Sequence, residues 1–171
     1  GIDRSILVKT SNSLEPLAVA KTLSKIIEKE NPDLVLMGKQ AIDDDSNQTG
    51  QILSALLDWP QACFISDLKI EGNKLSISRE IDEGIEKIES SLPAVITCDL
   101  RLNTPRFASL PNIMKAKKKP LDIIDVTSLG IDTDPKIKII KVEEPPKRKA
   151  GIMVNDVKEL VEKLKYEAKV I

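Results

Sequence analysis

The sequence predicts an α/β fold in which a mostly parallel sheet is flanked by helices. Between residues 6 and 66, three short apolar runs alternate with two stretches whose apolar residues recur at helical spacing, so the predicted order is β-α-β-α-β. Strands that are joined through a helix run parallel, with right-handed crossovers. A length of 171 residues, with 41% apolar and 31% charged residues, is typical of a globular domain with one sizeable core.

The first two strands and the helix between them are predicted from residues 6–38. A short strand is expected at residues 6–10, and Asn31-Pro32 ends the helix that follows, because the residue before a proline disfavours helical geometry. The buried face of this helix is expected to hold Val19, Leu23, Ile26 and Ile27. Residues 33–38 are almost entirely apolar, which predicts a strand covered on both faces.

A second helix and a third strand complete the parallel part. The buried face of this helix is expected to hold Thr49, Ile52, Leu53, Leu56 and Leu57. Trp59-Pro60 is expected to end the helix, and the apolar residues 62–66 predict a short buried strand. Beyond them, apolar residues alternate with period 2 around Gly72-Asn73, which indicates a β-hairpin.

The second half of the chain is predicted to be less regular. Residues 92–100 are expected to form another buried strand, whereas residues 101–120 are irregular and basic. Residues 136–142 alternate like a half-exposed strand, and prolines and charges predict a linker at residues 143–151.

A closing helix follows the predicted linker. Asp156 and Glu159 have the spacing of a capping box, with aspartate in place of the usual serine or threonine. The apolar stripe of this helix consists of Val157, Leu160, Val161 and Leu164. Such a helix packs either on its own domain or on a partner subunit. We therefore expect an α/β domain at residues 1–142 and a C-terminal arm at residues 143–171.

The composition argues against several functions. A formal net charge of −1 and only four aromatic residues disfavour binding to nucleic acid, and no apolar run approaches the length of a membrane helix. The absence of histidine excludes Ser-His-Asp and Cys-His catalysis and histidine-ligated metals, so no catalytic or metal-binding residue is assigned. Cys63 and Cys98 lie in strand-like segments and are expected to be buried spectator thiols. Because Gly1 lies so close to a core strand, we expect the chain to lack an N-terminal portion of a longer protein.

Three consecutive aspartates occupy the loop before the second helix. A helix N-terminus attracts anions, and Asn47, Gln48 and Thr49 add side-chain donors there. A carboxylate about 6 Å from a phosphate is opposed by roughly 3 kcal/mol per charge pair at an effective dielectric constant near 20. The partial positive charge of the helix N-terminus stabilises a bound anion by only about 0.3–2 kcal/mol. Either no phosphate binds here, or the carboxylates of Asp43, Asp44 and Asp45 turn away from it.

The carboxylates have other uses in such a loop. Asp45 or Ser46 is expected to cap the helix, and Asp45 and Gln48 have the spacing of a capping-box variant. Asp43 and Asp44 are expected to accept backbone N–H groups of the loop, to meet Lys39, or to contact an adenine or ribose. A magnesium site and a plain solvated loop are the alternatives to a nucleotide loop, which the pattern favours.

Three long motifs resemble the β subunits of electron-transfer flavoproteins. The segment GKQAIDDDSNQTGQ at residues 38–51 resembles the family's nucleotide-binding loop. The segment ISREIDEGIEKIESSLPAVIT at residues 77–97 has the family's basic-acidic-glycine run and proline-led strand, and residues 99–120 are similar to its partner-recognition loop. The resemblance covers nearly the whole chain, although the family's first strands and a second set of nucleotide contacts are absent.

The resemblance implies an adenine-nucleotide-binding (α-hydrolase-like) domain that holds one structural AMP. FAD would sit mainly on the α subunit, and the C-terminal arm would pack on that subunit. The heterodimer would carry electrons from acyl-CoA dehydrogenases and related flavoenzymes of fatty acid β-oxidation to a membrane-bound quinone oxidoreductase, as a carrier and not an enzyme. Its location would be the mitochondrial matrix or the bacterial cytoplasm. The residues expected to line the AMP site are Gly38, Lys39, Gln40, Ala41, Asp44, Asn47, Gln48 and Thr49.

The basic segment is expected to recognise partner proteins. Leu110 lies between Ser109 and Pro111 and is expected to project into a partner's pocket, which would stabilise a complex by about 1.5–3 kcal/mol. The resemblance assigns recognition to Leu110, Pro111, Ile113 and Met114, and makes Lys115 and Lys118 candidates for methylation. From the residues alone, a solvated lysine face and a short amphipathic helix pinned to the core are the simpler interpretations.

Two other functions stay open at this point. A bifurcating-type relative would hold a second FAD in place of AMP, although the QAIDDDSNQTGQ form favours AMP. A stand-alone nucleotide-binding module of the universal-stress type would need no partner subunit. A pyrophosphatase-type enzyme is disfavoured because the chain has no Ser-Gly-Gly-x-Asp-Ser loop.

Overall fold

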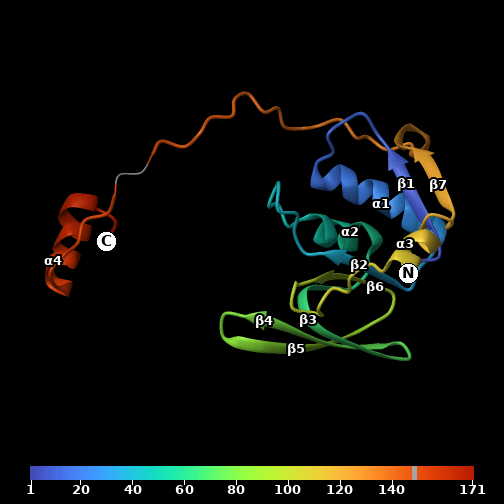
Figure 1. Ribbon diagram of the computed structural model, residues 1–171, viewed down its shortest axis with the longest axis horizontal. Helices are drawn as coiled ribbons and strands as arrows, with labels where there is room; N and C mark the ends of the chain where they lie inside the picture. Colours follow the sequence, from blue (N-terminus) through green and yellow to red (C-terminus); the bar gives the residue numbers. More distant parts are fainter. Residues whose placement is uncertain (148–149) are drawn as a thin grey trace. The chain divides into compact units, whose positions relative to one another are not determined.

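The computed structural model describes residues 1–147 and 150–171, which form two units (Figure 1). The first unit, Gly1–Ile137, contains both sheets and the helices that cover them. The second unit, Lys138–Ile171, contains the closing helix. Positions 148 and 149 of the predicted linker lie outside the described residues.

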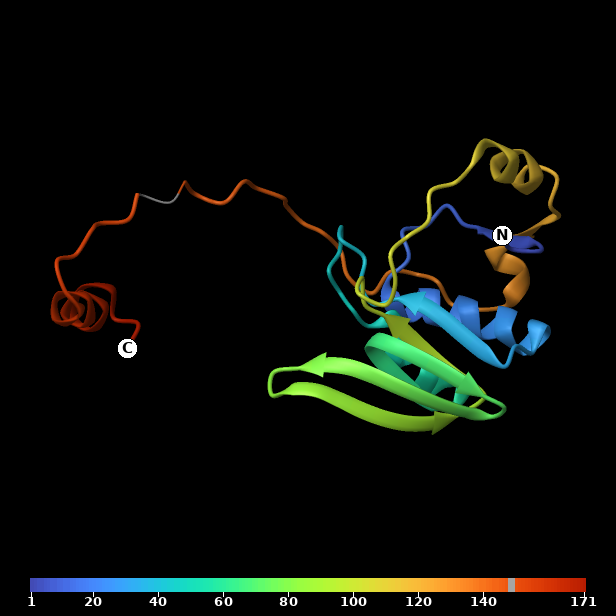
Figure 2. The ribbon, with the colours of Figure 1, turned by 60° about the horizontal axis from the view of Figure 1, so that its bottom comes forward.

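The larger sheet of the first unit is mixed and has five strands (Figure 2). Its strands, in spatial order, are β2 (Leu34–Gly38), β6 (Ala94–Cys98), β3 (Gln61–Glu71), β4 (Lys74–Ile81) and β5 (Gly84–Ser91). The strands β2, β6 and β3 run parallel, whereas β3, β4 and β5 form consecutive antiparallel pairs. The predicted α/β fold and the hairpin around Gly72-Asn73 are confirmed. The strand β5 was not predicted.

A separate two-stranded parallel sheet consists of β1 (Ser5–Lys9) and β7 (Leu121–Asp125). The strand β1 confirms the expectation for residues 6–10, but β7 was not predicted. Residues 136–142, which were expected to form a strand, contain none, and their isoleucines are exposed. The alternation in that segment therefore has no sheet to support it. Instead, the backbone N–H groups of Lys136 and Ile137 donate to the Glu15 carboxylate.

The helices of the first unit are α1 (Pro16–Glu30), α2 (Thr49–Leu57), α3 (Leu110–Ala116) and the 3₁₀ turn η1 (Val126–Leu129). Pro16 opens α1, where its missing N–H is not needed, and Asn31 ends the helix in the left-handed conformation with φ of 48°. The helices α1 and α2 pack together, and α2 packs on β6 and β3. The helix α3 lies within the segment that was expected to be irregular.

The hydrophobic core has two parts, one on each face of β6. Ala94 and Ile96 belong to a cluster with residues of β3 and β4, while Val95 belongs to a cluster with α1 and α2. The prediction that β2 is covered on both faces is wrong: β2 is an edge strand, and the Leu36 side chain is 55% exposed.

On the inner faces of the helices, mostly small residues are more deeply buried than the large residues that were predicted to be buried there. Of the residues predicted to be buried in α1, Ile27 is buried, whereas Val19, Leu23 and Ile26 are half-buried. The other buried residues of α1 are Ala18, Ala20, Thr22 and Ser24. In α2 they are Gly50, Leu53 and Ser54, whereas Leu56 is exposed. Close approach of the backbones explains the difference, because small side chains at the contact let helix and sheet meet.

The second unit ends in α4 (Val157–Glu162), which continues as π-helical residues Lys163–Ala168. Asp156 caps α4 as predicted, accepting from the Glu159 backbone N–H at 2.8 Å. The Glu159 carboxylate accepts from Asn155 and not from the cap residue itself, so the predicted box is displaced by one residue.

The contact between α2 and β6 predicts the effect of enlarging Gly50. A Cβ at this position would lie 2.4 Å from Thr97 Cγ2, so alanine cannot be accommodated without moving the helix. Overpacking costs about 1–3 kcal/mol, which exceeds the roughly 1 kcal/mol that alanine gains over glycine in a helix. We expect Gly50→Ala to lower the free energy of unfolding, as measured in urea.

The control is the same substitution beside a smaller neighbour. Thr97→Ser removes the Cγ2 methyl and keeps the hydroxyl, so Gly50→Ala should cost less in the Thr97→Ser background. An equal cost in both backgrounds would show that the close approach is not the cause.

Candidate functional site

The candidate site lies where the parallel strands β2 and β6 end and where the pairing of β3 with β6 ends. Ligands of open α/β sheets bind outside this edge. Lys39 follows β2, Asp99 follows β6, and Phe64 lies in an irregular part of β3. The loop of residues 39–48, called here the aspartate loop, leaves the same edge and leads into α2 (Figure 1).

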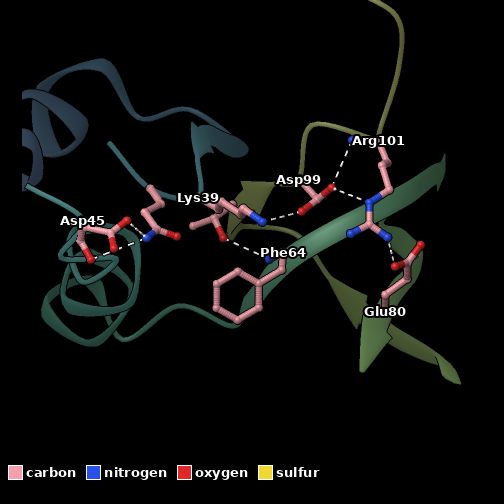
Figure 3. A network of polar contacts seen from close by, with 8 residues as sticks. Lys39, Asp45, Phe64, Glu80, Asp99 and Arg101 are labelled. Atoms are coloured by element: carbon pink, nitrogen blue, oxygen red, sulfur yellow. Dashed lines mark hydrogen bonds and ion pairs between the residues drawn. The ribbon is translucent and has the colours of Figure 1, made fainter. Parts of the chain in front are cut away.

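A polar network joins these strand ends (Figure 3). Lys39 Nζ donates to Asp99 Oδ2 at 2.6 Å, and the Arg101 backbone N–H donates to Asp99 Oδ1 at 3.0 Å. The Arg101 side chain approaches Asp99 Oδ1 at 3.3 Å and also pairs with Glu80. The Asp99 carboxylate is thus held from two sides by positive charge.

Burial and hydrogen bonding set the charge state of Asp99. Its side chain is only 8% exposed, compared with 33% for Lys39. The hydrogen bond from Lys39, followed by the one from the Arg101 backbone, lowers the pKa of the Asp99 carboxyl below its ordinary value. Asp99 is therefore ionised throughout the neutral pH range.

A bulge in β3 shapes the floor of the site. The pairing of β3 with β6 shifts register between Ala62 and Ile65, and Phe64 has a φ of 60°. The Phe64 N–H donates to Thr97 Oγ1 at 3.1 Å, which satisfies the group that the bulge removes from the ladder. A small cavity of about 190 Å³ is lined by Lys39, Phe64, Ser66, Glu80, Asp99 and Arg101.

The three aspartates stabilise their own loop. Asp43 Oδ1 accepts from the Asp44 N–H at 3.1 Å, and Asp44 Oδ1 accepts from the Ser46 N–H at 3.2 Å. The Asp45 carboxylate accepts from the Gln40 side-chain amide. The expectation that Asp43 and Asp44 accept loop N–H groups is confirmed, but Lys39 pairs with Asp99 and not with either of them.

The predicted capping of α2 by Asp45 or Ser46 is wrong. The N-cap residue is Gln48, and no side chain caps the helix. Asp45 and Asn47 both adopt positive φ, of 56° and 50°, which winds the chain so that the Asp45 carboxylate meets Gln40 instead. Within residues 1–147 and 150–171, the first-turn N–H groups of α2 thus have no side-chain acceptor.

Polar side chains of the first turn of α2 are arranged beside these amides. Gln51 Nε2 donates to Asn47 Oδ1 at 3.1 Å. Gln51 Oε1 is buried and has no donor among the described residues. A buried acceptor of this kind usually has a partner, so a donor from a ligand or solvent would satisfy it.

The residues predicted to line a nucleotide site all lie on the segment that runs from the end of β2 to the start of α2. Gly38 ends β2, Thr49 begins α2, and Lys39, Gln40, Ala41, Asp44, Asn47 and Gln48 lie in the aspartate loop between them. Asp99, Arg101, Glu80 and Phe64 were missed by the sequence reasoning. The first of them had a usable signal, because Asp99 ends the predicted strand at residues 92–100 just as Lys39 follows the strand at residues 33–38.

A second surface is formed by α3 and the residues around it. Leu110 begins this helix and is 73% exposed, with Pro111 beside it in the first turn. Ile113 and Met114 are also exposed, and Lys115 and Lys118 carry positive charge along the same segment. No residue of α3 is buried, which excludes the simpler interpretation of a helix pinned to the core of this unit.

Neither a carboxylate- or thiolate-rich metal site nor a membrane span is found among the described residues. The described part of the chain contains no group of three or more histidine, cysteine, aspartate or glutamate residues arranged to hold a metal ion. Apart from positions 148 and 149, no helix is long and apolar enough to cross a membrane.

Comparisons with known proteins agree on one family. The family model described as the electron transfer flavoprotein domain matches residues 1–129. The chain is 56% identical over 171 residues to the electron transfer flavoprotein subunit beta of Bradyrhizobium diazoefficiens, covering 100% of this chain and 69% of that protein. It is 54% identical over 169 residues to that of Bos taurus, covering 96% and 66%. The mitochondrial counterpart of Arabidopsis thaliana is 53% identical over 173 residues, with 100% and 69% covered. The chain thus spans about two thirds of the length of these relatives.

The buried carboxylate at the site predicts a pH-dependent stability. The pKa of Asp99 is lower in the folded chain than in the unfolded chain, where it is about 3.9. The stabilisation by the Asp99 carboxylate is therefore complete above about pH 5 and is lost as the pH falls through the folded pKa. We expect Asp99→Asn to lower the urea midpoint at pH 7, and the gap to the wild type to narrow below about pH 4.

The matched control is Asp67→Asn, which removes an exposed aspartate from β3. It should change the urea midpoint little at either pH. If the gap between Asp99→Asn and the wild type were the same at pH 7 and pH 3, the Asp99 carboxylate would not be stabilised by its neighbours.

Proposed function

This chain belongs to the electron transfer flavoprotein family, and from that premise we propose that it is the β subunit of a heterodimeric electron carrier that holds one AMP. The premise rests on the family match over residues 1–129 and on identities of 53–56% to β subunits of bacterial, animal and plant proteins. The observation that carries the AMP assignment is the uncapped N-terminus of α2 beside a loop whose acids are already engaged.

The arrangement of the aspartate loop supports phosphate binding despite its acidity. Each of Asp43, Asp44 and Asp45 accepts a hydrogen bond from within the loop. The backbone amides of the first turn of α2 have no side-chain acceptor among the described residues, so they suit an anion. Asn47, Gln48 and Thr49 are the side-chain donors that we assign to the phosphate.

The nucleoside would be held by acceptors and backbone at the same edge. Gln51 Oε1 is a buried acceptor without a donor in the described chain, and an adenine amino group or a ribose hydroxyl would provide one. We assign Gly38, at the end of β2, and Gln40, Ala41 and Asp44 of the aspartate loop to the nucleoside. The family resemblance implies that AMP is structural and not catalytic, and we propose that role here.

Electron transfer itself would depend on a flavin held mainly by an α subunit. Bound FAD supplies the redox chemistry by accepting and releasing electrons. The chain described here would contribute the nucleotide site and the surface that meets other proteins. Its proposed donors are acyl-CoA dehydrogenases and related flavoenzymes, and its proposed acceptor is a membrane-bound quinone oxidoreductase. The proposed compartment is the mitochondrial matrix in a eukaryote and the cytoplasm in a bacterium.

The exposed surface on α3 supports a role in partner recognition. Leu110, Ile113 and Met114 present apolar side chains to solvent, and Lys115 and Lys118 add charge that would steer acidic partners. A single anchor in a pocket gives an affinity suited to a mobile carrier, which has to bind and release. Methylation of Lys115 or Lys118 would keep their charge.

The C-terminal arm is proposed to pack on the α subunit. Val157, Leu160 and Val161 form an apolar stripe on α4 that is exposed in the chain alone. Burying such a stripe against a partner subunit would stabilise the heterodimer.

The nucleotide content of the purified heterodimer tests the proposed function. The full-length protein is expressed with its α subunit, the complex is denatured, and the released nucleotides are separated by chromatography. We expect one FAD and one AMP per heterodimer. Combining Asn47→Ala with Thr49→Ala should reduce AMP to well below one per heterodimer, because it removes two donors from the phosphate.

The matched control is Asn103→Ala with Thr104→Ala, which removes the same residue types from an exposed segment. This control should keep its AMP. Two FAD per heterodimer would instead indicate a bifurcating-type relative, and a flavin-free chain that binds ATP would indicate a stand-alone module. Full AMP content in the Asn47/Thr49 variant would contradict the assignment of those residues.

The recognition surface is tested by Leu110→Ala. Removing most of a side chain that becomes buried in a complex weakens that complex by roughly tenfold, so the KM of an acyl-CoA dehydrogenase for the carrier should rise by a similar factor. FAD content should not change. Ile85→Ala is the control, because Ile85 is similarly exposed at 70% but lies on β5. Unchanged reduction kinetics in Leu110→Ala would exclude this residue as the anchor.

A further inference from the structure

Lys39 is the one lysine of the aspartate loop, and its ammonium already has a partner. A lysine at the start of such a loop is ordinarily a candidate ligand for a phosphate. Here Lys39 Nζ lies 2.6 Å from Asp99 Oδ2, and two thirds of the Lys39 side chain is shielded from solvent. The charge that the loop carries toward the strand ends is therefore neutralised by a residue 60 positions away in the chain.

Asp99 is held rigidly where it meets Lys39. Its backbone N–H donates to the Ile65 carbonyl at 3.0 Å, which extends the parallel pairing between β6 and β3 by one residue. Its second carboxylate oxygen accepts from the Arg101 backbone. On the other side, the Lys39 N–H donates to the Cys98 carbonyl at 3.2 Å. The ion pair thus connects two backbone segments that are each tied to β6.

Moving Lys39 to a phosphate would be costly. The Asp99 side chain is 8% exposed, so loss of its partner would leave a nearly buried carboxylate short of one cation. Arg101 does not replace the lysine, because its guanidinium is shared with Glu80 on β4. The pair is consequently expected to persist when a ligand binds.

We propose that Asp99 is a positioning residue of the nucleotide site, which holds Lys39 as a strut at the base of the aspartate loop and not as a phosphate ligand. This inference rests on the proposed function, because the ligand it concerns is AMP. The Lys39–Asp99 pair keeps the first residues of the loop against β6, and so presents the amides of α2 and the donors Asn47 and Thr49 in one place.

The test compares four variants of the full-length heterodimer: Asp99→Asn, Lys39→Gln, the double variant, and Lys39→Arg. AMP is removed from each complex, and the dissociation constant for added AMP is measured by titration calorimetry. Asp99→Asn and Lys39→Gln each break the same ion pair, so each should weaken AMP binding by roughly tenfold. The double variant should bind AMP no more weakly than either single variant, because only one interaction is lost. Lys39→Arg keeps the ion pair and should bind AMP nearly as well as the wild type.

A second measurement follows the loop without any ligand. Hydrogen–deuterium exchange of residues 39–48 is recorded in the AMP-free complexes. We expect faster exchange in Asp99→Asn and Lys39→Gln and wild-type exchange in Lys39→Arg. The matched control is Glu28→Gln, which breaks the exposed Lys25–Glu28 pair on α1 and should leave both the exchange of the loop and the affinity for AMP unchanged.

The outcomes separate this inference from the proposed function. If Asp99→Asn binds AMP as tightly as the wild type, or more tightly, while Lys39→Gln binds it weakly, then Lys39 is a phosphate ligand and the inference is wrong. Additive losses in the double variant would also overturn it. If the wild-type complex binds no AMP, the proposed function fails, and the exchange of residues 39–48 still decides whether the strut exists. Should Asp99→Asn fail to fold, the inference is tested by comparing Lys39→Gln with Lys39→Arg in loop exchange and in affinity for AMP.

Discussion

The strand β6 is the element on which the rest of the first unit depends. Its residues alternate between two hydrophobic clusters, with Ala94 and Ile96 on one face and Val95 on the other. It pairs with both β2 and β3, and α2 packs against it through Gly50 and Thr97. Because both β2 and β3 pair with β6, the residues at the end of β6 also help to form the edge that carries the candidate site. Asp99 is the first residue after β6, and its ion pair with Lys39 joins the start of the aspartate loop to the segment that follows β6.

The acidity of the aspartate loop and its proposed use as an anion site are compatible because of the loop's hydrogen bonds. Each of the three carboxylates is occupied by a donor inside the loop, while the lysine of the loop is bound by a carboxylate outside it. Positive φ at Asp45 and Asn47 turns the chain so that these bonds can form, and both residue types tolerate that conformation. The loop is thus built from its own side chains, and the amides of α2 are left for another partner.

Local patterns predicted what depends on neighbours in sequence. The strands around residues 6–10, 62–66 and 92–100, the hairpin at Gly72-Asn73 and the Asp156 cap were all recoverable from period, turn chemistry or cap spacing. Interactions across the fold were not. The division into two sheets, the edge position of β2 and the pairing of Lys39 with Asp99 each depend on a partner far along the chain. The capping of α2 was predicted wrongly for a local reason, because the Asp45 carboxylate accepts from the Gln40 side chain five residues earlier and not from the helix. The location of the site was therefore predictable, but its internal contacts were not.

The position of β6 between β2 and β3 has a consequence for synthesis of the protein. Lys39 and Asp99 are 60 residues apart, so at ordinary rates of about 5–20 residues per second the ribosome delivers β6 roughly 3–12 s after β2. Once β2, α2 and β3 have been made, the strand that pairs β2 with β3 does not yet exist. The edges of β2 and β3 that later pair with β6 are then unpaired, and unpaired strand edges are prone to aggregation. The edge that carries the candidate site consequently cannot assemble until this non-local pairing has formed.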